Sequence, residues 1–478
     1  MTALSAGVGG KSLNGLMDAI FNPKSVAVVG VPEGPKMGRL FLMGLVASGY
    51  KGKIYPVNPR ADEIDGIKVI KRTREIPGPI DLAIVLVPKK HLPGIIDELG
   101  EVGTTAAVIF TAGLAELGEE GASEQRLLVE RAGKAGIRLI GPNCQGVYSP
   151  KAGMSFFPGM PTTPGDVSFV AGSGSLASMT VWRAASRHLY FSKVISFGNA
   201  CDLTPSDFAS YFAGDDETKV IISYIEGIPE GRRFFETLKG VTPKKPVVVW
   251  KAGLTDLGAK AALSHTGALS GNSELWEAAL RQLGAVTAQG MDEIVDAMMA
   301  LKFIPYPLGK RVAILSGPGG LAVSAADIVA REGLALAALT EETKRKIAKV
   351  IPGEGTSVKN PVDVGLGASG ISEQYTLPAR YLLEDPNVDS VVIIGGTFYK
   401  EMNEVYRREL ISAKNDTKKA LIAVTLEEFT KNVGDDRMEA EFIEGGVPTF
   451  PSPERALSAL KKVYDYGEFL RAVGDSGE

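Results

Sequence analysis

The sequence is poor in cysteine and histidine. Its 478 residues include only 2 cysteines, Cys144 and Cys201, and 3 histidines. Two cysteines cannot build a disulfide framework or a four-cysteine metal site, and no metal-ligand spacing is present among the histidines and acidic residues. We therefore expect no metal site in this chain.

Long apolar runs and an excess of one charge are also missing. No segment approaches the roughly 20 apolar residues that a membrane helix needs. The beginning of the chain lacks the charged-then-apolar pattern of a signal peptide. A formal net charge of −4 gives no reason to expect nucleic acid or an anionic membrane surface as a partner. The sequence thus predicts a cytoplasmic protein that binds neither nucleic acid nor a membrane.

Apolar strands alternate with helical patterns three times along the chain. Continuous apolar strands of this kind indicate parallel sheets covered on both faces, which bind ligands at the carboxyl ends of their strands. We predict an α/β fold with three doubly wound domains, over 1–150, 160–305 and 309–478. A stretch rich in proline and glycine, 149–166, is interpreted as a linker. The predicted strands are 25–30, 53–57, 82–87, 106–110 and 138–141 in the first domain, 167–170, 193–196, 220–225 and 246–250 in the second, and 311–316, 390–394, 420–424 and 447–450 in the third.

The second and third blocks open alike, with an apolar strand, a glycine-rich turn and a helix. A helix N-terminus offers free backbone N–H groups and a favourable dipole, so both turns are candidate phosphate sites. The alternative for each is a capped helix start without a ligand. The candidate phosphate-binding residues are Gly172, Ser173, Gly174, Ser175, Gly317, Pro318, Gly319 and Gly320.

Polar and glycine-containing turns follow the strands of the first block. The first turn is longer than the G-x-G-x-x-G of nicotinamide-binding folds and contains Lys36, which suits a nucleotide with several phosphates. Ordinary turn chemistry is the alternative. Because these turns meet at one edge of a parallel sheet, we predict a cofactor site there. Its candidate residues are Gly30, Lys36, Val57, Asn58, Pro59, Val87, Pro88, Thr111, Ala112, Gly113, Asn143 and Cys144.

His265 lies in a run of small and hydroxyl residues, 263–272, beyond the apolar strand 246–250. We interpret this run as a glycine-rich loop in which the imidazole is accessible, and neutral imidazole is a good nucleophile near pH 7. Glu226, at the end of strand 220–225, could hydrogen-bond one ring nitrogen and leave the other free to attack. The alternative for Glu226 is a solvated acid at a strand end.

The segments Gly258–Ala262 and Ser264–Ala268 resemble the α subunit of ADP-forming acyl-CoA synthetases, which belong to the superfamily of succinyl-CoA synthetase. The resemblance extends over essentially the whole chain. It implies a Rossmann-like CoA-binding domain followed by two flavodoxin-like domains. It also implies that His265 is transiently phosphorylated, that Glu226 holds the phosphohistidine, and that the two helix starts bind its phosphate.

One segment departs from the family pattern. The family reads Ser-Gln-Ser-Gly before the first of these helices, whereas this chain reads Ala-Gly-Ser-Gly over 171–174. The contacts that the family's glutamine makes are therefore in question.

The resemblance implies a partner, because no segment matches the family's ATP-grasp module. A separate β subunit would bind ATP or ADP with Mg²⁺, in an α2β2 assembly. The implied reaction interconverts acyl-CoA, ADP and phosphate with a carboxylic acid, CoA and ATP. Two alternatives stay open here: a CoA-binding regulatory or scaffolding homologue without turnover, and a nicotinamide-dependent dehydrogenase built on the first domain.

Overall fold

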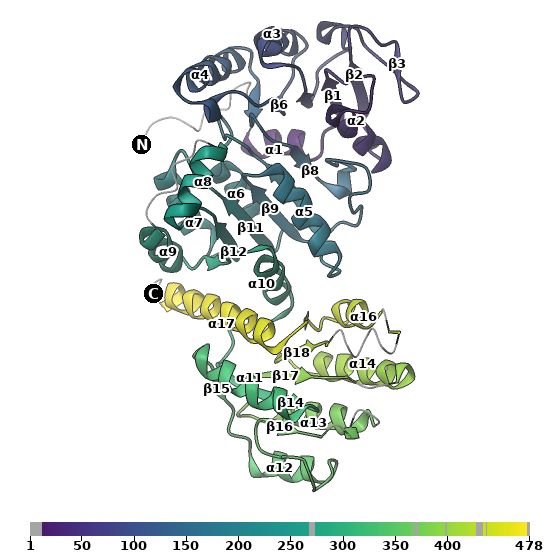
Figure 1. The fold of residues 1–478 in the computed structure, drawn as a ribbon, viewed down its shortest axis with the longest axis vertical. Coiled ribbons are helices and arrows are strands. Elements are labelled where there is room, and N and C mark those ends of the chain that lie inside the picture. The colour runs from purple at the N-terminus through teal and green to yellow at the C-terminus, as the bar shows by residue number, and fades with distance from the viewer. Residues whose placement is uncertain are drawn as a thin grey trace. The chain divides into compact units, whose positions relative to one another are not determined.

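A computed structural model describes residues 12–266, 273–365, 367–368, 371–396, 399–426, 434–435 and 437–475, with the backbone alone at 263–266 and 475. It divides into two compact units, 1–289 and 290–478. The predicted α/β fold is confirmed, with parallel sheets flanked by helices (Figure 1). No helix in the described ranges has the length and apolar character to cross a membrane.

The first sheet of unit 1 is parallel, in the order β2-β1-β5-β6-β7. Its strands end in register, with Val29 opposite both Val57 and Val85, so the turns that follow them lie along one edge. The elements are α1 (Leu13–Phe21), β1 (Ser25–Val29), α2 (Met37–Ala47), β2 (Lys53–Val57), β3 (Glu63–Ile64), β4 (Ile67–Lys68), η2 (Thr73–Glu75), β5 (Leu82–Val85), η3 (Lys89–His91), α3 (Leu92–Glu101), β6 (Ala106–Ile109), η4 (Ala115–Leu117), α4 (Glu119–Lys134) and β7 (Arg138–Ile140).

The second sheet of unit 1 has the order β13-β12-β11-β9-β10-β8. Its parallel part follows the 2-1-3-4-5 order of flavodoxin-like folds. The elements are β8 (Gly146–Tyr148), η5 (Pro150–Ala152), β9 (Val167–Ala171), α5 (Gly174–Ala185), β10 (Phe191–Ser196), α6 (Pro205–Gly214), β11 (Val220–Ile225), α7 (Gly231–Val241), β12 (Val247–Lys251), α8 (Asp256–Thr266), α9 (Ser273–Gln282) and β13 (Val286–Thr287).

The stretch from 149 to 166 differs from its interpretation as a linker. Directly before it lies β8, which the sequence did not predict and which pairs antiparallel with β10, Val147 opposite Ile195. Farther along, Met154 and Phe156 are fully buried, and Phe157 packs against Phe41 of α2 with 5.8 Å between ring centroids. The apolar side chains between the prolines and glycines therefore make this segment part of the core.

The second sheet also sends a segment back to the first. In the loop after β10, the backbone N–H groups of Asn199 and Cys201 donate to the carbonyls of Pro142 and Gly141, both at 3.0 Å. Asp202 accepts a bidentate pair of hydrogen bonds from Arg138 at 2.8–3.0 Å. A bidentate pair fixes orientation as well as distance. The two sheets of unit 1 are thus joined twice, by the pairing of β8 with β10 and by the backbone hydrogen bonds from the loop after β10 to the turn after β7.

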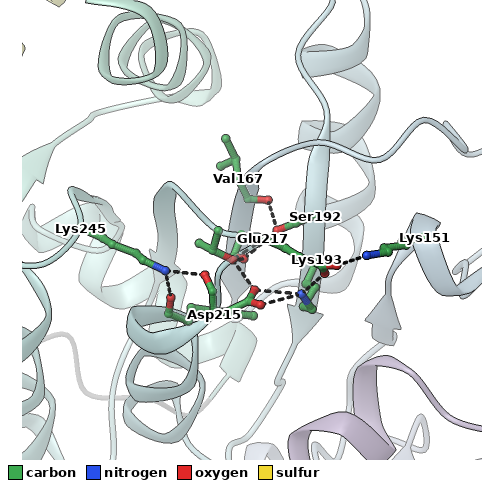
Figure 2. A network of polar contacts seen from close by, with 10 residues as sticks. Lys151, Val167, Ser192, Lys193, Asp215, Glu217 and Lys245 are labelled. Carbon is green, nitrogen blue, oxygen red and sulfur yellow. Dashed lines mark hydrogen bonds and ion pairs between the residues drawn. The ribbon is translucent and has the colours of Figure 1, made fainter. Parts of the chain in front are cut away.

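A buried polar network lies at the amino edge of the second sheet (Figure 2). The ammonium of Lys193, which is 1% exposed, contacts Asp215 at 2.9 Å and Glu217 at 2.6 Å. Asp215 also accepts from the Thr218 hydroxyl at 2.6 Å, and Lys245 donates to the Asp215 carbonyl at 2.5 Å. The network therefore connects β10 with the segments that precede β11 and β12, at the edge opposite the predicted site.

Unit 2 contains a sheet in the order β15-β14-β17-β18-β19, again flavodoxin-like, with β16 paired to β14. Its first helix, α10, lies within the range predicted for the second domain but packs on α17 in unit 2, where Asp296 pairs with Arg455. The elements are α10 (Met291–Phe303), β14 (Arg311–Ser316), α11 (Gly319–Arg331), β15 (Ala335–Leu336), α12 (Glu341–Ala348), β16 (Val362–Asp363), α13 (Glu373–Glu384), β17 (Ser390–Ile394), α14 (Lys400–Asn415), β18 (Ala420–Val424), α16 (Met438–Glu444), β19 (Thr449–Phe450) and α17 (Pro453–Asp475).

Candidate active site

Two of the predicted site segments meet at the carboxyl edge of the second sheet. The backbone N–H of Gly172, after β9, donates to the Tyr224 carbonyl at 3.0 Å, two residues before Glu226. Helix α5 begins at Gly174, and the Ser173 side chain caps it by accepting from the Leu176 N–H at 3.4 Å. The structure therefore places a helix N-terminus and the turn with Glu226 on neighbouring strands, which is where a bound phosphate would find free N–H groups.

The start of α5 has a neighbour that sequence reasoning missed. A Cβ added at Gly174 would lie 2.6 Å from Cγ of Gln145, so the glutamine side chain covers this glycine. The Gln145 carboxamide oxygen accepts from the Ser178 hydroxyl at 2.6 Å. The loop before β8 thus supplies a carboxamide beside the helix start, although position 172 carries glycine instead of the family's glutamine. The signal in the sequence that could have pointed to Gln145 was its position in the turn 141–146, which follows the last strand of the first sheet.

Glu226 is held on two sides. The Tyr224 hydroxyl donates to Oε1 at 3.0 Å, and the ammonium of Lys251 donates to the Glu226 backbone carbonyl at 2.7 Å. Oε2 is buried and has no hydrogen-bond partner among the described residues. Glu226 is therefore not a freely solvated strand-end acid, because one of its oxygens is enclosed and available to accept a hydrogen bond.

Lys251, at the end of β12, is a second residue that the sequence did not single out. Its side chain is 5% exposed, and burial lowers its pKa to about 8. The ammonium donates to the carbonyls of Glu226 and Ala252 and lies 5.4 Å from the centroid of the Trp276 ring. Lys251 thereby joins the ends of β11 and β12 to α9, the helix that follows the histidine segment.

The predicted loop around His265 is wrong in its first half. Helix α8 spans Asp256–Thr266, so the backbone of His265 is helical, and 267–272 lie outside the described residues. The helix forms because alanines at 259, 261 and 262 favour it, Asp256 suits the first turn, and the Thr255 hydroxyl accepts from the Gly258 N–H at 3.1 Å. Helix α8 packs against η4, which follows β6 of the first sheet.

The predicted cofactor residues converge on the carboxyl edge of the first sheet. The Gly30 N–H donates to the Val57 carbonyl at 2.9 Å, and the Thr111 hydroxyl donates to the Val87 carbonyl at 2.6 Å. Gly30 has φ +89°, and a Cβ there would lie 2.8 Å from Cγ1 of Val87. Only glycine lets these two turns approach so closely. The edge is completed by Pro59, Pro88, Ala112 and Gly113 in the same turns and by Asn143 in the turn after β7.

Two residues of this set, Asn58 and Cys144, do not present their side chains to a ligand. The Asn58 carboxamide is used inside the protein, donating to the Val31 carbonyl at 2.7 Å and accepting from the Arg60 N–H at 2.7 Å. Cys144 is 3% exposed, and burial raises the pKa of its thiol to about 12. Lys36 precedes α2 at its N-cap position without a side-chain capping bond. Contacts from Asn58 and Cys144 to a ligand would therefore come from the backbone.

A carboxylate stabilises the turn after β6. Glu116 of η4 accepts from the Gly113 N–H at 2.5 Å and from the Asn199 carboxamide at 2.7 Å. Burial opposes ionisation of Glu116, but these hydrogen bonds outweigh it and lower the pKa of the carboxyl. The turn at Gly113, the loop after β10 and α8 thus meet at η4.

A groove of about 970 Å³ lies between α3 and α4 of the first sheet, with Leu92, Leu114 and Leu128 among the residues that line it. None of the predicted cofactor residues lines it. The groove nevertheless adjoins the carboxyl edge, because Lys89 and Leu114, which line it, directly follow Pro88 and Gly113.

The second predicted helix start is in unit 2. Helix α11 begins at Gly319 with Pro318 at its N-cap, and the Ser316 hydroxyl donates to the Pro318 carbonyl at 3.0 Å. A Cβ at Gly319 would overlap Oδ2 of Asp363, and a Cβ at Gly317 would overlap the Tyr375 hydroxyl. A side chain at 317 or 319 would thus force Tyr375 or Asp363 to shift, while Gly320 has open space beside it.

Comparisons with known proteins agree with this architecture. A model of the CoA binding domain matches residues 24–150, and a model of the succinyl-CoA ligase-like flavodoxin domain matches 164–301. The α subunit of acetate–CoA ligase (ADP-forming) II from Pyrococcus furiosus is 39% identical over 93% of this chain and 96% of its own length. Acetate–CoA ligase (ADP-forming) I from Archaeoglobus fulgidus is 37% identical over 95% of this chain, which spans 64% of that protein.

A solved structure leads to the same family. The dinucleotide-forming acetyl-coenzyme A synthetase 1 of Ca. Korarchaeum cryptofilum, in complex with phosphate and ADP, superposes with a TM-score of 0.85 at 31% identity. The match covers 96% of this chain and 98% of that one. The chain therefore belongs to the family of ADP-forming acyl-CoA synthetases, whose α subunits it matches along almost their full length.

Proposed function

We propose that this chain is the α subunit of an ADP-forming acyl-CoA synthetase and that His265 carries the phosphoryl group. One observation supports this most directly. Helix α8, which contains His265, starts at the sheet edge with Glu226 and packs against η4 at the edge predicted to bind CoA. This arrangement of α8 supports a histidine that serves both edges.

The proposed chemistry has three balanced steps. Phosphate attacks the thioester carbonyl of an acyl-CoA, giving an acyl phosphate and the free thiol of CoA. One imidazole nitrogen of His265 takes the phosphoryl group, and the carboxylate leaves. The phosphohistidine then transfers the group to ADP, which regenerates imidazole and forms ATP. Phosphoryl transfer depends mainly on positioning and charge stabilisation.

The residues around the edge have separate roles in this proposal. Glu226 accepts a hydrogen bond from one ring nitrogen of His265 and so fixes the tautomer that leaves the other nitrogen free. The helix start at Gly172–Ser175 offers backbone N–H groups to the phosphate. The start of α11 at Gly317–Gly320, in unit 2, is a second candidate phosphate-binding helix start.

CoA would bind at the carboxyl edge of the first sheet, where its thiol is the nucleophile in acyl-CoA formation. The close turns at Gly30 and Val87, with Thr111 and Gly113 beside them, suit a ligand that lies along the strand ends. Lys36 at the start of α2 would pair with its phosphates.

The nucleotide would bind on a partner subunit. Single-chain relatives extend beyond this chain, which spans 64% of the Archaeoglobus protein but 96% of the Pyrococcus α subunit. We infer that a separate ATP-grasp β subunit holds ATP or ADP with Mg²⁺ in an α2β2 assembly, and that the complex works in the cytoplasm. The ligase names of the relatives favour turnover over a purely regulatory role.

The test is phosphate transfer from γ-labelled ATP to the complex of both subunits. Label on the wild-type chain should be stable in alkali and lost in acid, as expected for phosphohistidine, and His265→Asn should abolish it. His188→Asn is the matched control, because His188 has φ +53° and asparagine tolerates that conformation. Undiminished labelling of His265→Asn would overturn the assignment.

Glu226→Gln tests the second role. The substitution should slow phosphorylation of His265 while the affinity for CoA stays unchanged, because Glu226 follows β11 of the second sheet and does not lie at the predicted CoA edge. An unchanged rate of phosphorylation would contradict the role given to Glu226.

A further inference from the structure

We propose that Tyr224 is a positioning residue that holds Oε1 of Glu226, so that Oε2 is the oxygen presented to His265. This inference rests on the proposed function and names the atom that acts in it. Neither Tyr224 nor the difference between the two carboxylate oxygens is visible in the sequence pattern.

The two oxygens of Glu226 have different surroundings. The Tyr224 hydroxyl donates to Oε1 at 3.0 Å, whereas Oε2 is buried without a hydrogen-bond partner in the described part of the chain. A buried carboxylate oxygen without a partner is unfavourable, and native structures satisfy such atoms with protein, water or a ligand. A ring N–H from the histidine segment would satisfy Oε2 without disturbing Oε1.

Tyr224 is rigid enough to act as this anchor. It is 8% exposed and makes an edge contact with Trp250, with 4.8 Å between ring centroids and 72° between ring planes. Burial and, secondarily, the neighbouring Glu226 carboxylate raise the pKa of Tyr224 above its ordinary value. The phenol therefore remains a protonated donor at physiological pH.

The backbone under the carboxylate is fixed as well. The ammonium of Lys251 donates to the Glu226 carbonyl at 2.7 Å and also to the Ala252 carbonyl. No ion pair between the ammonium and the Glu226 carboxylate is present, so Lys251 holds the main chain while Tyr224 holds the side chain. With both anchors in place, rotation of the carboxyl group away from the site requires breaking the Tyr224 hydrogen bond.

The experiment measures the rate at which His265 is phosphorylated by labelled ATP in the assembled complex. Tyr224→Phe removes the hydroxyl and keeps the ring that packs on Trp250. We expect the rate to fall about tenfold, as is typical when a partner that orients an active group is lost, with the KM for CoA unchanged. In a Glu226→Ala background the same substitution should have no further effect, because there is no carboxylate left to orient.

Tyr148→Phe is the matched control. Tyr148 is 1% exposed and donates to the Pro161 carbonyl at 2.6 Å, so this variant loses a comparable buried hydrogen bond away from Glu226. We expect His265 of this variant to be phosphorylated at the wild-type rate. Thermal unfolding of each variant separates a loss of folded protein from a loss of rate per folded molecule.

The outcomes separate the two levels of the proposal. If His265→Asn keeps the label, the proposed function itself fails, and if Glu226→Ala keeps the wild-type rate, the role given to Glu226 fails. If those variants behave as expected but Tyr224→Phe is as fast as Tyr148→Phe, the positioning role is refuted. Equal losses from Tyr224→Phe in the wild-type and Glu226→Ala backgrounds would also refute it, because a merely structural residue acts independently of Glu226.

Discussion

Replacing Lys193 with methionine should destabilise unit 1 without affecting the chemistry of the proposed site. Methionine keeps most of the length of the side chain and removes the charge that Figure 2 shows between Asp215 and Glu217. The substitution leaves Asp215, whose side chain is 9% exposed, without its main counter-charge. Removing one partner of a buried pair costs about 3–5 kcal/mol, because the other charge stays buried and uncompensated.

The neighbours of Asp215 and Glu217 place the expected loss of unfolding free energy near the lower end of this range. Asp215 keeps the hydrogen bond from the Thr218 hydroxyl, and Glu217 keeps its ion pair with Lys151. Because Glu217 is 36% exposed, water screens its interaction with Lys193 and little is lost there. We therefore expect Lys193→Met to lower the free energy of unfolding by about 3 kcal/mol.

Urea unfolding followed by circular dichroism measures this loss as a shift in the midpoint multiplied by the slope. Lys219→Met is the matched control. Lys219 is 70% exposed and pairs with Asp166 at 3.1 Å, so its loss should cost about 0.5 kcal/mol. The double variant Lys193→Met with Asp215→Asn should lose less than Lys193→Met alone, because it also removes the stranded carboxylate.

A loss from Lys193→Met no larger than that from Lys219→Met would refute the reasoning, since it would mean that the buried charge contributes nothing. The network lies at the amino edge of the sheet, and Glu226 lies at the carboxyl edge. Folded Lys193→Met should therefore still accept phosphate on His265 at the wild-type rate.

Two further predictions concern titratable groups. The pKa of Lys251 is about 8 in the folded chain and 10.5 ordinarily, so between these values the unfolded chain binds more protons and stability rises with pH. Relative to Lys251→Met, the free energy of unfolding of the wild type should rise by up to about 3 kcal/mol between pH 8 and 10.5. Urea titrations at several pH values measure this difference between the two proteins. A difference that stays constant across this range would contradict the burial of the ammonium. The Cys144 thiol, with its pKa raised from 9.0 to about 12, should be alkylated by iodoacetamide at pH 8 about a thousandfold more slowly in the folded than in the unfolded chain. Peptide mass spectrometry checks this, and equal rates would show that Cys144 is accessible.

The sequence predicted strands far better than it predicted short or glycine-flanked elements. Strand 311–316 was predicted at the observed bounds, because its four central residues, 312–315, form a continuous apolar run. Strand β8 has three residues among glycines and prolines, too few for a periodic signal. Helix α8 was missed because Gly253, Gly258 and the hydroxyl residues after Leu263 indicate a loop locally, whereas the alanines between them favour a helix.

The site was predictable only as far as strand ends determine it. Parallel strands bring their carboxyl ends to one edge, and this agrees with the grouping of Gly172 and Glu226 that the family resemblance implied. The partners that orient Glu226 could not be found this way. Tyr224 and Lys251 act through a carboxylate oxygen and backbone carbonyls, and such contacts depend on the register of β9, β11 and β12 and on the burial of their ends.

Each sheet of unit 1 is completed by a segment that neighbours the other sheet in the sequence, and this determines how the protein can be divided. Strand β8 follows the first sheet along the chain but completes the second, and the loop after β10 returns to pair with the first. A graft of residues 1–150 onto another protein would remove β8 from β10 and expose an edge strand, while the Arg138 guanidinium would lose Asp202. The first sheet is therefore not a transferable module, and a chimaera that borrows it must take residues 1–289 together.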